Sequence, residues 1–448
     1  GIDPGRVTIR RLNKAEYNNT IRDLVGVEFR PADDFPSDDV GYGFDNIGDV
    51  LSLPPILFEK YLTAAERISE LAIIAPDAER EPLKSEKGRT LASVSEATVK
   101  FQVTAAGEYR LRSQAWADQA GDEKAKMMLK VDGTEVQTVS VEAEGGKAAD
   151  YDVTLRLEPG EHTFAARFIN DFYNPKDPDP KNRDRNLTVD RLVVFGPLNV
   201  LPADLPVSHR RLVTCRPEKP EQLADCCRTI LKPFVTKAFR RPAEDGELSR
   251  LTQLVAGVVG NGESFERGLQ LAMQAVLVSP EFLFRIEIDA DPLNPLAIRT
   301  INDWELATRL SYFLWSSLPD DELFKLAAEG TLRKDGNLSA QVKRMLKDPK
   351  SSALVDNFAT QWLNLRLLRS INPDKQRFPG FTDALRSDME VETRLFFDSI
   401  VREDRSIFDL LDGQYSFLND RLAKHYGIPE VEGSEFRKVT LTNDQRGG

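Results

Sequence analysis

Apolar residues alternate with polar ones between about residues 90 and 195, and this period of two predicts β-strands. The turn signals Asp132-Gly133 and Pro159-Gly160 separate some of the runs. Short strands at regular spacing are typical of an antiparallel β-sandwich, here of jelly-roll type. The side chains expected in its core are those of Val99, Phe101, Val103, Tyr109, Leu111, Met127, Leu129, Val131, Val136, Val139, Val141, Val153, Leu155, Leu157, Phe164, Ala166, Phe168, Leu187, Val189, Leu192 and Val194.

Before this region, apolar residues recur every three to four positions, which predicts helices. Asn13 followed by Glu16 indicates a helix start, and Gly26 indicates its end. A second helix is expected from Pro54-Pro55 to about Ile74. The loop between the two helices is acidic, and its carboxylates are expected to cap helices and stay solvated: Asp33, Asp34, Asp38 and Asp39.

After Pro220 the helical spacing returns and continues to the end of the chain. The first of these helices is expected to be interrupted or kinked at Pro233. A helix after Asp303 is expected to turn Phe313 inward together with its leucines. The aromatic residues of this region are interpreted as packing core, not as a cofactor site: Tyr312, Phe313, Trp315, Phe358 and Trp362.

The predicted fold class is therefore multidomain and mainly α, with an inserted antiparallel β-sandwich. A chain of 448 residues is too long for one core. Because two helices alone cannot bury their apolar stripes, residues 6–80 are expected to pack against residues 200–448. The expected domains are an N-terminal helical domain over 1–85, the sandwich over 86–200, a middle helical domain over 201–295 and a C-terminal helical domain over 296–448.

Composition narrows the possible partners. The net charge of −12 argues against a nucleic-acid or anionic-membrane surface. The apolar runs are far shorter than the ~20 residues that span a bilayer. The chain opens on Gly1-Ile2-Asp3-Pro4 and stops at Arg446-Gly447-Gly448, so it is interpreted as a piece of a longer polypeptide.

The stretch Phe168–Gly196 carries the candidate binding chemistry. Two apolar runs enclose an oxygen-rich loop that Pro175, Pro178 and Pro180 prevent from being helical. Carboxylate and amide oxygens at strand ends suit Ca²⁺ or sugar hydroxyls. The loop is not an EF-hand, because Lys181 stands where an acid is required. The alternative is a solvated connection whose acids form exposed ion pairs with Lys176, Lys181, Arg183 and Arg185.

Cysteine and histidine usage gives little support for catalysis. Cys215 and Cys226 form a disulfide if the protein is exported, or otherwise stay with Cys227 as buried thiols. No C-x-x-C motif is present, so this chain attaches no c-type haem. His162 is expected on a strand, His209 as a solvated residue of a basic linker, and His425 near the end of a helix. None of the common nucleophile, zinc or phosphate-loop motifs occurs, and we interpret the segment as non-catalytic.

The helical regions resemble a known group of proteins. RRLNKAEYNNTIRDLVGV and FPSDDVGYGFDN resemble the opening domain of planctomycete-type cytochrome-associated surface proteins, whose helical domains are uncharacterised in function. ILKPFVTKAFRRPAEDGEL and ELATRLSYFLWSSLPDDELFKLAAEGTL resemble their later helical domains. The resemblance implies haem only in segments outside this chain, a cytochrome c domain of the same polypeptide as a partner, and an exported, periplasmic or cell-surface location. Its Cys-x-Pro…Cys pattern falls on Cys215, Pro217 and Cys226 and favours that disulfide.

The β region is similar to the calcium-dependent, xylan-binding type of carbohydrate-binding module, although the Pro-rich insert 173–183 is a departure. The resemblance implies a Ca²⁺ ion that coordinates sugar hydroxyls. It implies metal ligands among Asn170, Asp171, Asp184, Asn186 and Asp190. The residues expected to contact the glycan are Trp116, Asp118, Gln119, Phe172 and Tyr173.

The sequence therefore predicts a non-catalytic carbohydrate-binding and scaffold segment of an exported cytochrome-type surface protein. The expected partner is a xylan-like or other diol-bearing polysaccharide. One alternative is part of an oxidoreductase that acts on polysaccharide, with its haem domain outside this piece. Another is a structural surface protein that assembles through its helical domains.

Overall fold

The computed structural model describes residues 9–75, 82–93, 95–287, 294 and 300–441. The chain forms two compact units, one of residues 1–65, 232–244 and 276–448, the other of residues 66–231 and 245–275. The four domain boundaries expected from the sequence stay predictions. Both chain ends on which the interpretation as a fragment rests, 1–8 and 442–448, lie outside the described residues. Within the described residues, no helix combines the length and apolar character that a membrane span requires.

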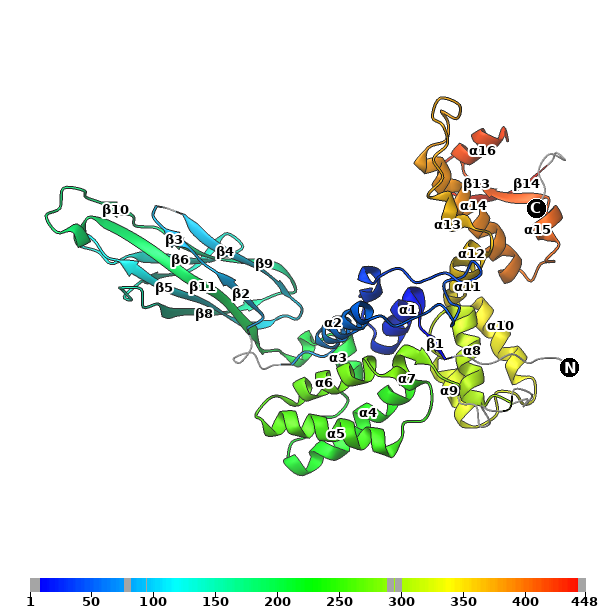
Figure 1. Ribbon diagram of the computed structural model, residues 1–448, viewed down its shortest axis with the longest axis horizontal. Helices are drawn as coiled ribbons and strands as arrows, with labels where there is room; N and C mark the ends of the chain where they lie inside the picture. Colours follow the sequence, from blue (N-terminus) through cyan, green and yellow to red (C-terminus); the bar gives the residue numbers. More distant parts are fainter. Residues whose placement is uncertain (1–8, 76–81, 94, 288–293, 295–299, 442–448) are drawn as a thin grey trace. The chain divides into compact units, whose positions relative to one another are not determined.

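The second unit contains a β-sandwich of two antiparallel sheets (Figure 1). One sheet has the order β10-β11-β5-β8, with β2 and β3 also paired to β11, and the other has the order β4-β9-β6-β7. The strands are β2 (Lys84–Lys87), β3 (Thr90–Leu91), β4 (Glu96–Val103), β5 (Gly107–Asp118), β6 (Lys126–Val131), β7 (Thr134–Ser140), β8 (Ala149–Leu157), β9 (Gly160–Phe168), β10 (Phe172–Tyr173) and β11 (Asp184–Asn199). The fold class predicted from the sequence is confirmed.

The core of the sandwich consists of the alternating side chains that the sequence indicates. Phe164 and Phe168 of β9 and Leu187 of β11 are fully buried, while Val136 and Val139 of β7 are only partly buried. The predicted hairpin at Asp132-Gly133 is present, with positive φ at both residues (49° and 81°), as a tight hairpin turn requires. The alternation therefore determined which face of each strand is buried.

The helices of the second unit are tied together by a disulfide and by buried polar contacts. Cys215 and Cys226 are bonded, with their Cα atoms 5.4 Å apart, which confirms the predicted pair, and Cys227 is a buried free thiol. His209 was expected to be solvated, and this prediction is wrong. Its ring is buried, and Nδ1 accepts a hydrogen bond from the Ile74 N–H at 3.0 Å. The helices here are α3 (Val207–Leu212), the first part of α4 (Leu223–Phe239), α5 (Asp245–Gly260) and most of α6 (Phe265–Leu277). Helix α4 is continuous through Pro233, and its residues from 232 onward belong to the first unit.

The first unit begins with the two predicted helices, α1 (Lys14–Val25) and the first part of α2 (Pro55–Ala72), whose residues 66–72 belong to the second unit. Asn13 and Glu16 form the expected capping box, and Gly26 ends α1 in the left-handed conformation. The ring of Tyr17 packs between Phe35, Tyr61 and Phe282, with centroids 5.1–5.9 Å apart. These contacts join the chain's beginning to its middle, as does the pairing of β1 (Arg10–Arg11) with β12 (Phe284–Arg285), which follows α7 (Pro280–Leu283).

The rest of the first unit is helical with one short hairpin. Trp315 is buried as predicted, but Phe313 points outward and is 64% exposed, because it lies on the opposite face of its helix. Phe358 and Trp362 are also substantially exposed, so the interpretation of all five aromatics as core is wrong. The elements are α8 (Asp303–Trp315), α9 (Asp321–Ala328), α10 (Asn337–Lys347), α11 (Ser352–Leu354), a π-helical segment (Val355–Ala359), α12 (Thr360–Trp362), α13 (Leu365–Leu368), α14 (Asp383–Arg402), α15 (Asp409–Asp412), β13 (Tyr415–Leu418), α16 (Asp420–Tyr426) and β14 (Arg437–Thr440).

Candidate functional site

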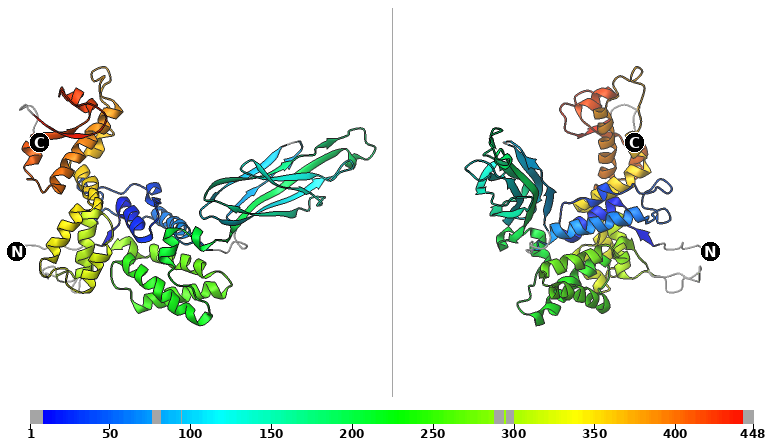
Figure 2. Two further views of the ribbon diagram at one scale, coloured as in Figure 1. Left: turned by 180° about the vertical axis from the view of Figure 1, so that it is seen from behind. Right: turned by 60° about the vertical axis from the view of Figure 1, so that its left-hand side comes forward.

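Most of the predicted site residues come from three adjacent strands at one tip of the sandwich, where the loop between β10 and β11 also lies (Figures 1 and 2). Across the β10–β11 pair, Tyr173 lies opposite Asp184. Across the β11–β5 pair, Asn186 lies opposite Asp118, and Thr188 opposite Trp116. Directly opposed residues on one face of a sheet have Cβ atoms about 4.5–5.5 Å apart. Side chains distant in sequence therefore become neighbours.

Strand alternation directs these side chains away from the core. Ala117 of β5 and Leu187 of β11 are fully buried, so the residues on either side of them point outward. Tyr173 is 70% exposed. We call this surface the outer face and define it by Trp116, Asp118, Tyr173, Asp184, Asn186 and Thr188. It combines two aromatic rings with carboxylate, amide and hydroxyl oxygens.

One polar contact and one unpartnered oxygen characterise the outer face. The indole Nε1 of Trp116 donates to Oδ1 of Asp190 at 3.2 Å. Asp190 lies at a register shift between Val189 and Arg191, where a β-bulge redirects one side chain. In contrast, the side-chain oxygen of Asn186 is buried and has no hydrogen-bond partner. An acceptor oxygen in this condition is suited to a cation, because a cation needs no hydrogen-bond donor.

Three predicted site residues make contacts within the protein. The side chain of Gln119 donates to the Val141 carbonyl and accepts from the Ala125 N–H. Asn170 accepts from the Lys126 N–H at 2.7 Å and donates to the Lys124 carbonyl at 2.8 Å. Phe172 lies under the guanidinium of Arg185, 5.3 Å from ring centroid to Cζ. These side chains shape the tip of the sandwich from within.

The loop between β10 and β11 is closed by its own hydrogen bonds. Asp177 accepts from the Asn182 side chain at 2.9 Å and from the Asp179 N–H at 3.0 Å. Asp179 caps the short turn at Pro180–Asn182. Arg183 donates to the Asp177 carbonyl at 2.7 Å. The acids Asp177 and Asp179 therefore organise the backbone, and the ion-pair interpretation of this part of the loop is wrong.

The metal role of the predicted ligands stays a prediction. Within the described residues, no group of three or more His, Cys, Asp or Glu is arranged to hold a metal ion. Asp171 is exposed, and Asn170 and Asp190 already have partners. The outer face does bring Asp184 and Asn186 beside Asp118, which was expected only as a glycan contact.

Asn182 was not singled out from the sequence, and Arg185 was named only as a partner of exposed ion pairs, although both hold the site together. Arg185 is buried and donates to the carbonyls of Asn170 and Ala120. Asn182 accepts from the Gly121 N–H at 2.7 Å and so ties the loop to the segment after β5. The one signal in the sequence was that Arg185, a charged residue, occupies a position of β11 whose side chain points inward.

These features define an antiparallel β-sandwich with an oxygen-rich outer face, in a chain that is otherwise mainly helical. Residues 110–203, which include all the residues of the outer face, match the family model "Ca-dependent carbohydrate-binding module xylan-binding" (CBM60). The helical segments match three models, each described as a protein of unknown function: PSD3 (DUF1587) over 10–74, PSD5 (DUF1595) over 226–287 and PSD4 (DUF1592) over 301–428.

Solved structures similar to part of the chain include several carbohydrate-binding modules. A family 35 module from Clostridium thermocellum is 14% identical, with a TM-score of 0.18, over 25% of this chain and 92% of that one. The CBM36-1 domain of a multidomain xylanase from the hindgut metagenome of Trinervitermes trinervoides is 13% identical, with a TM-score of 0.19, over 28% and 96%. The CBM6cm-2 module of Cellvibrio mixtus lichenase 5A, in complex with cellotriose, is 14% identical, with a TM-score of 0.18, over 28% and 95%. Among curated proteins, none matches this chain.

Proposed function

We propose that the β-sandwich binds a xylan-like or other diol-bearing polysaccharide on its outer face, as the non-catalytic binding segment of an exported protein. The observation that carries the proposal is the family match over residues 110–203, which spans the residues of the outer face. Trp116 and Tyr173 would stack on sugar rings, since aromatic side chains offer a flat apolar surface with a polar edge. The helical domains would serve as scaffold, with a cytochrome c domain elsewhere in the polypeptide.

Calcium is the ion that this site would hold. Asp118, Asp184 and Asn186 would supply carboxylate and amide oxygens, the ligand type that Ca²⁺ prefers. The buried, unpartnered oxygen of Asn186 supports this assignment. When bound, the ion would coordinate vicinal sugar hydroxyls. The disulfide between Cys215 and Cys226 supports an exported location, periplasmic or at the cell surface, because such bonds persist in oxidising compartments.

The test is affinity electrophoresis of the full chain in gels that contain soluble xylan. We expect retardation that Trp116→Ala with Tyr173→Ala abolishes. Phe408→Ala, at an exposed aromatic residue in the first unit, is the matched control and should bind normally. Normal retardation of the double variant would overturn the assignment of the outer face.

The calcium assignment is tested separately. EDTA should abolish retardation, added Ca²⁺ should restore it, and Asp184→Asn should lower the apparent Ca²⁺ affinity. Binding that is lost in the aromatic variant yet unaffected by EDTA would remove the ion from the proposal and leave the glycan site.

A further inference from the structure

Three aromatic rings of the first unit lie nearly parallel to one another at the protein surface. The centroids of Phe44 and Phe358 are 5.8 Å apart at 15°, and those of Phe358 and Trp362 are 5.8 Å apart at 18°. We call these three residues the aromatic stack. Phe397 supports it from one side, with its centroid 6.3 Å from Phe358 and 6.5 Å from Trp362. Despite these contacts, Phe358 is 38% exposed and Trp362 is 49% exposed.

The backbone beneath the stack has an unusual conformation. Val355–Ala359 is π-helical and includes Phe358, and it continues into α12, which ends at Trp362. π-helical segments are rare and occur often at functional sites. In an α-helix, residues four positions apart are offset by about 40° around the axis, so the wider π turn helps to align Phe358 with Trp362.

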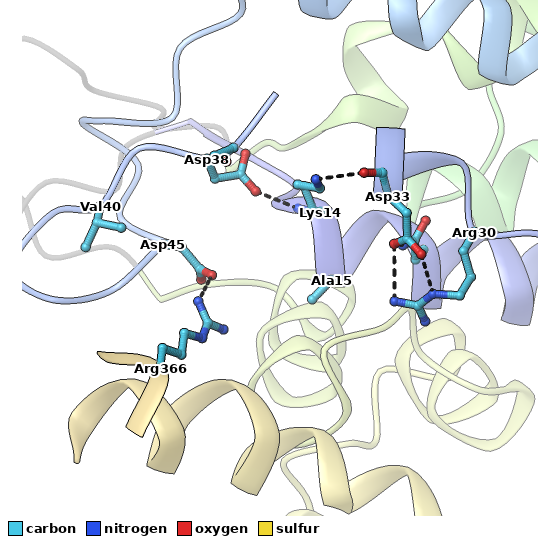
Figure 3. A pocket seen from close by; sticks show the side chains of 10 residues that line it. Lys14, Ala15, Arg30, Asp33, Asp38, Val40, Asp45 and Arg366 are labelled. Carbon is cyan, nitrogen blue, oxygen red and sulfur yellow. Dashed lines mark hydrogen bonds and ion pairs between the residues drawn. The ribbon is translucent and has the colours of Figure 1, made fainter. Parts of the chain in front are cut away.

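A polar pocket of about 320 Å³ lies beside Asp45, the residue that follows Phe44 (Figure 3). This volume is at the lower end of the range of small-ligand sites. Its lining includes three cations and three carboxylates, which balance one another: Lys14, Arg30 and Arg366 with Asp33, Asp38 and Asp45. A balanced lining of this kind suits a neutral, hydroxyl-bearing ligand better than a phosphate or another strongly charged group.

Asp45 connects the pocket to the stack. Its carboxylate pairs with Arg366 at 2.5 Å across the pocket (Figure 3). Its backbone N–H donates to the side chain of Gln361 at 2.8 Å, directly before Trp362 in sequence. Thus the dipeptide Phe44-Asp45 contributes a ring to the stack and a carboxylate to the pocket wall. Flat apolar rings beside a few fixed polar groups are the usual composition of a ligand site.

We propose that the aromatic stack and this pocket form a second glycan-binding site, which takes pyranose rings of a neutral polysaccharide. The apolar face of a sugar ring would stack on Trp362, and its hydroxyls would reach Asp45 and Arg366. The choice of a sugar among neutral ligands rests on the proposed glycan binding of the β-sandwich in the same chain. The second site needs no metal ion, since its polar groups are already charge-paired.

The test uses the full chain, with xylohexaose and cellohexaose as probes. In a variant whose outer face is removed by Trp116→Ala with Tyr173→Ala, we expect residual binding that resists EDTA. Adding Trp362→Ala should weaken that binding about tenfold, which corresponds to about 1.4 kcal/mol of binding free energy. Trp362→Phe keeps a stacking ring and should bind nearly normally. Phe378→Ala, an exposed aromatic residue of the same unit, is the matched control.

Tryptophan fluorescence gives an independent readout. The chain has four tryptophans, and the outer-face variant lacks one of them, Trp116. In that variant the sugar-dependent emission change should disappear when Trp362→Phe is added, although binding persists. Absence of EDTA-resistant binding would overturn the second site and leave the first. Residual binding that Trp362→Ala does not weaken would also overturn it. So would an oligomer of the chain that Trp362→Ala dissociates, because the aromatic stack would then be an interface between copies of the chain. If Trp362→Ala abolishes all binding while the outer-face variant binds normally, the second site stands and the proposed function of the outer face fails.

Discussion

The indole Nε1 of Trp116 donates a hydrogen bond to Oδ1 of Asp190, 3.2 Å away on the neighbouring strand. Asp190 can reach the indole because the register of β11 shifts by one residue at this point. A bulge of this kind changes the direction of one side chain without breaking the sheet. The contact therefore fixes how Trp116 presents its ring on the outer face.

Removing this contact should weaken glycan binding moderately. Asp190→Ala deletes the acceptor, and we expect a loss of about fivefold in affinity, near the 1 kcal/mol typical of a hydrogen bond. Asp190→Asn keeps an oxygen acceptor and should bind nearly as well as the wild type. Titration calorimetry with xylohexaose measures both. Equal losses in the two variants would show that the charge of Asp190 matters, and not its hydrogen bond.

Arg185 should be important for the stability of the sandwich. Its buried guanidinium donates to the carbonyls of Asn170 and Ala120 and covers the ring of Phe172. Arg185→Met leaves two buried acceptors without donors, and each such group costs roughly 1–3 kcal/mol. We expect a lower thermal midpoint for the sandwich and weaker glycan binding. Arg183→Met is the control, because Arg183 is less buried and donates to one carbonyl of the loop, that of Asp177. Equal destabilisation by both variants would contradict this role for Arg185.

His209 should make the second unit sensitive to acid. Burial, aided by Arg216, lowers the pKa of His209 from 6.5 to about 4. Between these values the unfolded chain binds a proton that the folded chain does not, so stability is fully present above pH 6.5 and is lost as pH falls toward 4. His209→Asn keeps an acceptor for the Ile74 N–H and should reduce this dependence. Urea unfolding at pH 4.5 and pH 7 measures it, and an unchanged slope in the variant would assign the effect to other groups.

Glu16 should give the first unit the opposite pH dependence, with stability that decreases as pH rises. Burial raises the pKa of Glu16 from 4.5 to about 7, against the lowering effects of Arg10 and the Asn13 N–H. The folded state therefore holds a proton that the unfolded chain releases. Stability is fully present below pH 4.5 and is lost as pH rises through about 7. Glu16→Gln should remove this loss, as measured by unfolding at pH 5 and pH 8; a variant with the wild-type pH dependence would refute it.

Reduction of the disulfide should destabilise the second unit. Cys215 and Cys226 are separated by 11 positions in sequence, and closing a loop of this size contributes roughly 2–4 kcal/mol. We expect a lower urea midpoint in the presence of dithiothreitol or in Cys215→Ser with Cys226→Ser. Cys227→Ala removes the free thiol and serves as the control. Its urea midpoint should fall in the presence of dithiothreitol as that of the wild type does. An unchanged midpoint after complete reduction, verified by thiol titration, would contradict this estimate.

The fold of the sandwich could be predicted because the sequence signals for it lie within short segments. Alternation along β5, β9 and β11 identified the buried side chains, and the Asp132-Gly133 turn fixed one register. Asp184 followed from the resemblance, and Trp116 and Tyr173 were expected as rings that stack on a glycan. The sequence did not indicate which strands would be neighbours. Gln119 and Asn170 could not be recognised as structural from their types, because their partners are backbone groups of other segments.

The helical regions were less predictable where polarity and burial disagree. His209 lies in a basic stretch, yet a remote N–H, that of Ile74, provides the partner that allows its burial. Phe358 and Trp362 have the type and spacing of core residues, but the packing around them leaves one side uncovered. The hydrophobic pattern indicates whether a side chain favours burial, and the tertiary contacts determine whether it is buried.

The π-helical turn at Val355–Ala359 has an evolutionary consequence. Such a turn differs from an ordinary one by a single additional residue, and each residue of an α-helix advances the chain by about 100°. Loss of one codon here would rotate Trp362 away from Phe44 while keeping the helix intact. Related chains could therefore gain or lose these parallel rings in one short insertion or deletion, with no other change in composition.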